Sequence, residues 1–107
     1  NIDHYICHRA SITAARPFPG QSVKSIYAYE VVSSSHWFSS SDFNGNIFVD
    51  ISSTFSKKIT TLKCYDGEIP SSPHARSLVG IESLARFRGC TSGVELAEAF
   101  QLIRELQ

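Results

Sequence analysis

The densest group of residues that could do chemistry lies at the start of the chain, where Asn1, Asp3 and His4 are followed by His8. Two histidines four residues apart lie on one face of a helix, and such a pair can bind one zinc ion. A catalytic zinc site also needs a third protein ligand and an open position for water, and no other residue is obviously spaced to supply that ligand. The alternative interpretation is a solvated helix start that Asp3 caps.

Two further polar segments have a structural explanation beside a chemical one. Residues 74–77 precede a predicted helix and could bind an anion through backbone N–H groups and Arg76, but capping of that helix by Ser77 explains the same residues. Glu95 and Glu98 could act as acid or base groups, although a carboxylate near an aromatic residue more often pairs with an arginine. The sequence leaves these alternatives open.

Cysteine usage and charge narrow the class of protein. Cys7, Cys64 and Cys90 are odd in number and form no C-x-x-C pair, which predicts no disulfide framework and favours a reducing, cytoplasmic setting. Nucleophilic catalysis by any of the three is not expected. Ten basic and ten acidic side chains cancel, so neither nucleic acid nor a membrane surface is a favoured partner. No apolar run reaches the roughly 18 residues that cross a bilayer.

The first half of the chain is expected to form one helix and two strands within a single domain of residues 1–107. The spacing of Ile6, Ala10 and Ala14 predicts a helix over 3–15, which Pro17 ends. Alternating and β-branched residues predict strands at 22–32 and 47–51, separated by a serine-rich loop.

The second half is expected to begin with two helices. Apolar residues at helical spacing predict a helix from Phe55 to Ile69, capped by Ser52 or Ser53. Ser77 can open the next helix. That helix is expected to end at Gly89, where Arg86 and Arg88 would face the negative end of its dipole. Residues 94–106 fit a buried strand or a helix equally well.

Short motifs occur in one order along the whole chain. They are Asn1-Ile2-Asp3-His4, Arg16-Pro17, Tyr29-Glu30-Val31, Val49-Asp50-Ile51, Lys63-Cys64-Tyr65, Pro73-His74-Ala75-Arg76-Ser77, Arg88-Gly89 and Ala97-Glu98-Ala99-Phe100. In this order and spacing, the chain resembles the carboxy-terminal part of the PIG-L/LmbE-like family of zinc-dependent N-deacetylases. The resemblance implies an α/β fold, a fragment of a doubly wound (Rossmann-like) sheet with about three strands and three helices.

The resemblance also implies roles for three residues. Asp3-His4 matches the segment that supplies the third zinc ligand in the family, so His4 is the inferred metal ligand and Asp3 the catalytic carboxylate beside it. Asn1 stands where many members carry a histidine thought to stabilise the oxyanion, and it can donate a hydrogen bond but not as a cation. The resemblance implies no ligand role for His8. It also does not identify which residues bind the substrate.

The family's amino-terminal His-Pro-Asp-Asp segment, which supplies two zinc ligands and the general base, is missing from residues 1–107. We therefore expect a piece of a longer protein that uses zinc to N-deacetylate an amino sugar. We expect one copy of this chain alone to hold no zinc ion with three protein ligands, and to be inactive. The expected partners are an amino-sugar substrate in the intact enzyme and a second copy of the chain. The alternative is a non-catalytic oligomerising or partner-binding module that keeps the deacetylase scaffold.

Overall fold

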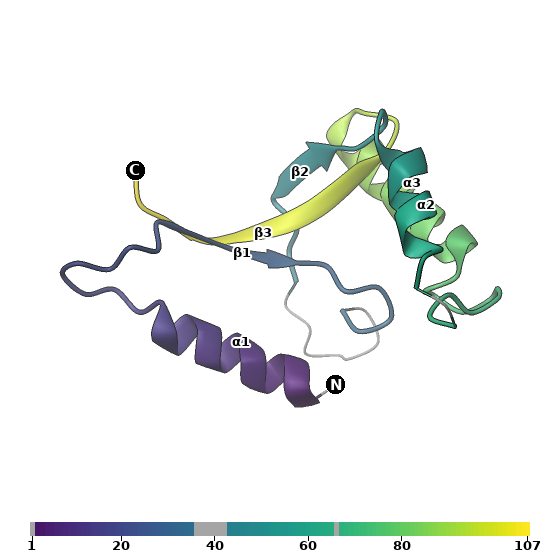
Figure 1. Ribbon diagram of the computed structural model, residues 1–107. Coiled ribbons are helices and arrows are strands. Elements are labelled where there is room, and N and C mark those ends of the chain that lie inside the picture. Colours follow the sequence, from purple (N-terminus) through teal and green to yellow (C-terminus); the bar gives the residue numbers. More distant parts are fainter. Residues whose placement is uncertain (1, 36–42, 66) are drawn as a thin grey trace.

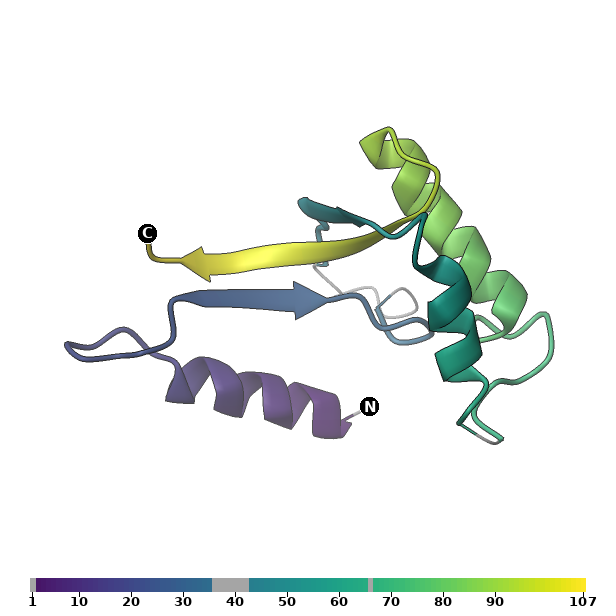
Figure 2. The same cartoon turned by 45° about the horizontal axis from the view of Figure 1, so that its top comes forward.

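A three-stranded sheet organises the chain, and its middle strand comes last in the sequence. The computed structural model describes residues 2–35, 43–65 and 67–107. The sheet contains, in spatial order, β1 (Ser25–Tyr29), β3 (Ala97–Glu105) and β2 (Ile47–Asp50). The helices are α1 (Ile2–Ala14), α2 (Phe55–Leu62) and α3 (Leu78–Ser92). In Figure 1 and Figure 2, α2 and α3 lie at the end of the sheet where β3 begins. α1 lies beside β1, on the side away from β3.

β3 is antiparallel to both of its neighbours. Phe100 lies at the centre of the sheet, opposite Tyr29 of β1 and Ile47 of β2. The pairing with β1 changes register between Ile26 and Tyr27, where β3 carries one extra residue. Such a bulge bends the strand and increases its twist, which fits the curved course of β3 in Figure 1.

The three strands and three helices confirm the expected mixed α/β content. The direction of the strands corrects the expectation of a doubly wound sheet. Such sheets are built mainly from parallel strands, whereas both pairings among the described residues are antiparallel. Alternation of apolar and polar residues predicts that a segment is a strand, but it does not specify the direction of the neighbouring strand.

The ends of the helices differ from the prediction at several places. α2 ends at Leu62 rather than Ile69 because Cys64 and Tyr65 donate to carbonyls three residues back, which tightens the chain into turns. Its N-cap is Thr54, which makes no side-chain capping bond, so capping by Ser52 or Ser53 was wrong. Ser77 does cap α3, because its Oγ accepts from the Gly80 N–H at 3.1 Å.

α3 continues beyond the predicted end. It runs through Gly89 to Ser92, and the left-handed residue that ends it is Gly93, with φ of 80°. The chain then turns back over the helix, because the N–H groups of Gly93 and Val94 both donate to the Gly89 carbonyl. The segment that could have been a strand or a helix is β3, and it begins four residues after Gly93.

The two predicted strands are shorter than expected, at Ser25–Tyr29 and Ile47–Asp50. Between them, Ser34 and Ser35 donate to the Val31 carbonyl in a turn. Residues 36–42 of the expected serine-rich loop lie outside the described part of the chain.

A turn at the end of β2 connects this edge strand to the start of β3. The Ser52 hydroxyl and N–H both donate to one Asp50 carboxylate oxygen, at 2.6 and 2.9 Å. These bonds, first that from the side chain, lower the pKa of the Asp50 carboxyl. The Ser52 Oγ in turn accepts from the Leu96 N–H at 3.1 Å. The charged form of Asp50 therefore stabilises this turn. The turn loses that stabilisation as the pH falls through the lowered pKa and the carboxylate is protonated.

The buried core is small. Ile51, Ala85 and Leu96 form its centre, with Phe55 packed against them from α2. No large side chain is fully buried among the described residues, and many large apolar side chains are exposed. The radius of gyration is 15.7 Å, against about 13 Å for a compact domain of this length. The described chain therefore leaves much apolar surface in contact with solvent.

The close approach at Gly89 gives a test of this architecture. A Cβ at Gly89 would lie 2.5 Å from the Glu95 carbonyl oxygen and 2.7 Å from that of Val94. Replacing a helical glycine by alanine normally stabilises a helix by about 1 kcal/mol, but here the backbone would have to move. We expect Gly89→Ala to lower the free energy of unfolding by about 1–3 kcal/mol, measured by urea denaturation.

The matched control is Cys90→Ala, which changes the adjacent and exposed position of the same helix. It should leave the free energy of unfolding within about 0.5 kcal/mol of the original value. A Gly89→Ala protein as stable as the original, or more stable, would contradict the packing of residues 94–95 over α3.

Candidate functional site

The sequence-predicted site residues lie on the first two turns of α1. The helix already includes Ile2, so Asp3 lies in its first turn rather than at the N-cap. There its carboxylate favours the positive end of the helix dipole. His4 and His8 follow one turn apart, and both are exposed. Asn1, the inferred oxyanion donor, lies outside the described residues.

α1 runs alongside β1 in the opposite direction, so that its first turns lie by the end of that strand (Figure 2). A cavity of about 390 Å³ lies between them. His4, Cys7 and His8 line it from α1, and Tyr27 and Tyr29 line it from β1. The structure thus brings the two histidines to one cavity. It brings no third ligand, because the described residues contain no cluster of three His, Cys, Asp or Glu side chains able to hold a metal.

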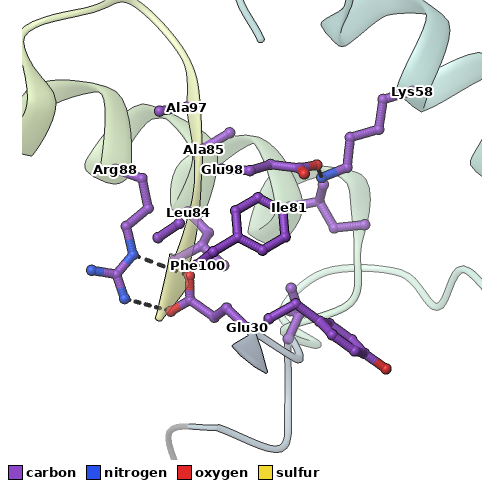
Figure 3. Close-up of a pocket in the computed structure, with 12 residues that line it drawn as sticks. Glu30, Lys58, Ile81, Leu84, Ala85, Arg88, Ala97, Glu98 and Phe100 are labelled. Atoms are coloured by element: carbon purple, nitrogen blue, oxygen red, sulfur yellow. Dashed lines mark hydrogen bonds and ion pairs between the residues drawn. The ribbon is translucent and has the colours of Figure 1, made fainter. Parts of the chain in front are cut away.

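A second cavity, of about 310 Å³, lies between α3 and β3, next to the end of β1 (Figure 3). Its apolar lining includes Ile81, Leu84 and Phe100. Tyr29, the last residue of β1, lines both cavities. The volume lies at the lower end of the range for small-molecule sites, about 300–1,000 Å³.

An ion pair between Glu30 and Arg88 closes one side of this second cavity. The Arg88 guanidinium donates to both carboxylate oxygens of Glu30, at 3.0 and 2.5 Å. The exposed fractions of these side chains are only 15% and 6%. The guanidinium also lies 5.7 Å from the Phe43 ring centroid and 5.5 Å from that of Phe87. This nearly buried, bidentate ion pair connects the end of β1 to α3.

On the other side of the cavity, Lys58 of α2 donates to Glu98 of β3, as Figure 3 shows. Glu98 was expected to pair with an arginine, and its partner is this lysine. Glu95 does lie near an arginine, 3.9 Å from Arg86. Both glutamates therefore have cationic neighbours, and neither is placed as an isolated acid or base.

Residues 74–77 form the expected loop before α3. Ser77 caps the helix, and the Arg76 guanidinium lies 3.5 Å from the Glu68 carboxylate. The Nδ1 atom of His74 accepts a hydrogen bond from the Arg76 N–H at 3.0 Å. These residues therefore cap the helix, which was the structural explanation that the sequence left open. The Arg76 guanidinium, which could have bound an anion, already lies next to the Glu68 carboxylate.

The Glu30–Arg88 pair is the feature that the sequence analysis missed. Arg88 was assigned to the end of a helix, and Glu30 was noted only within a motif. Their positions are 58 residues apart, so no local spacing could have connected them. The three cysteines are free and exposed in the structure.

Comparisons with protein-family models, curated proteins and solved structures give no match for this chain. Among residues 2–35, 43–65 and 67–107, no helix is long and apolar enough to cross a membrane.

The buried ion pair can be measured against an exposed one on the same helix. Removing the Glu30 partner with Arg88→Met leaves a nearly buried carboxylate, so we expect it to lower the free energy of unfolding by about 3 kcal/mol in urea denaturation. Arg86→Met removes an exposed partner of Glu82, whose contacts with Arg86 are 3.0 and 2.8 Å. It should cost less than about 1 kcal/mol.

The double variant Glu30→Gln/Arg88→Met removes the carboxylate charge together with the guanidinium, and it should recover part of the loss. Equal costs for Arg86→Met and Arg88→Met would show that α3 is not held to the end of β1 by this pair.

Proposed function

We propose that this chain is the carboxy-terminal part of a zinc-dependent hydrolase that N-deacetylates an N-acetylated amino sugar. The observation that carries the proposal is the exposed Asp3-His4 pair, which belongs to the first of the ordered PIG-L/LmbE-like motifs. His4 of this pair lines the cavity beside β1. His4 has no hydrogen-bond or ion-pair partner among the described residues, so its imidazole is available to a metal.

The His4 imidazole can supply one ligand of a zinc site, but it cannot form such a site alone. An imidazole is a common zinc ligand, but a catalytic site has three protein ligands and one open position. Zinc would supply a bound water with its pKa lowered to about 7. In the proposed enzyme, His4 holds the metal and Asp3 helps to orient the site, while two more ligands and the general base come from residues outside this chain. The isolated chain is accordingly inactive in this proposal.

The remaining features of the proposal follow from composition and from the site. Three exposed free thiols are consistent with a reducing, cytoplasmic setting. The proposed substrate is an N-acetylated amino sugar, bound in the intact enzyme. A charge balance of ten basic against ten acidic side chains favours no nucleic-acid partner.

One observation favours a second candidate, a non-catalytic module that associates with itself or with another protein. Exposed apolar side chains lie on α1, on α3 and on all three strands, including Tyr5, Tyr29, Val49, Phe87 and Ile103. β1 and β2 are also both edge strands of the sheet. Edges and apolar surface of this kind promote association, so a homo-oligomer is part of this second proposal.

An acetate-release assay separates the two candidates. With N-acetylglucosamine and added zinc, we expect no activity from the chain of residues 1–107, because the general base and two ligands act as a unit with His4. The protein translated from the complete reading frame should deacetylate the substrate, and His4→Ala should lower its kcat by at least about 10³-fold.

His74→Ala in the same complete protein is the control, and it should retain activity, since His74 only accepts a backbone bond. A complete protein that never releases acetate would favour the module. Turnover by the isolated chain that disappears in His4→Ala would contradict the proposal that other ligands are needed.

A further inference from the structure

We propose that His4 and His8 together chelate one divalent transition-metal ion on the surface of α1. The motif is His-x-x-x-His within a regular helix of 13 residues. Residues four apart on a helix lie on one face with Cβ atoms about 5–6 Å apart. That spacing lets two imidazoles reach a single ion, as they do in helical zinc motifs of the same spacing.

The surroundings of the pair favour a metal ion. Both histidines are exposed, and both line the cavity between α1 and β1. Neither imidazole has a hydrogen bond or ion pair among the described residues, so no existing interaction has to be broken. Among the described residues, no Lys or Arg side chain lines the cavity, and therefore none of the described lining residues carries a fixed cation that repels the ion.

Two protein ligands define the strength and the selectivity of the site. Water fills the remaining coordination positions, so the ion exchanges more easily than it does from a structural zinc site of four ligands. Imidazole donors bind Cu²⁺, Ni²⁺ and Zn²⁺ well and Mg²⁺ or Ca²⁺ poorly. Cys7 lines the same cavity, but the described residues contain no set of three donors able to hold one metal, so the ligands are the two imidazoles.

This inference goes beyond the proposed deacetylase. The resemblance gives His8 no role, and the two-imidazole site needs no residue outside α1. A failure of the deacetylase assay would therefore leave it untouched, and a failure of the metal titration would leave the deacetylase proposal to be judged on the complete protein.

The test is a calorimetric titration of the chain with nickel chloride at neutral pH, followed on the same samples by far-ultraviolet circular dichroism to verify helix content. We expect one Ni²⁺ per chain. His4→Ala and His8→Ala should each weaken binding by at least about tenfold, because a single imidazole loses the advantage of chelation. Cys7→Ser and His74→Ala should bind nickel as the original chain does.

A spacing control separates chelation from the mere number of histidines. His8→Ala/Arg9→His keeps two imidazoles on α1 but places them five residues apart, off the shared face. It should bind as weakly as His8→Ala. Binding by this variant equal to that of the original chain would overturn the proposal. So would a tenfold loss in Cys7→Ser, or the absence of nickel binding by the original chain.

Discussion

The position of β3 between the other two strands is the constraint on which the rest of the described structure depends. β1 and β2 do not pair with each other, so each joins the sheet only through β3. The strand also carries Ala97 and Ala99, which are among the few buried residues, and Glu98, which pairs with Lys58 of α2. The last segment of the chain thus unites elements formed much earlier in the sequence.

Local sequence signals predicted the elements of this fold better than their arrangement. The four-residue apolar spacing predicted α1 almost to its ends, and Ser77 identified the start of α3 because capping is a contact between neighbours. The pattern of residues 94–106 could not distinguish strand from helix. This segment is a strand because it pairs with β1 and β2, which lie tens of residues earlier in the sequence. A local pattern of apolar residues does not contain this information.

The candidate site divides in the same way. The His4–His8 pair is local, so its spacing alone predicted that the two side chains share a helix face, and the structure confirms this. The second cavity is not local. Its walls depend on Glu30 meeting Arg88 and on Lys58 meeting Glu98, contacts that require the complete sheet and both later helices. Among the described residues, no further His, Cys, Asp or Glu side chain joins these two histidines in a cluster of three able to hold a metal.

The proposed function depends on whether His4 is a ligand in a site that other parts of a longer protein complete. The most direct measurement is a crystal structure of the protein translated from the complete reading frame, with anomalous data collected at the zinc absorption edge. We expect one zinc ion with an imidazole nitrogen of His4 about 2.0–2.1 Å away, and two further protein ligands from residues outside this chain. A zinc ion bound without His4, or held by three ligands all within residues 1–107, would contradict the proposed role of His4.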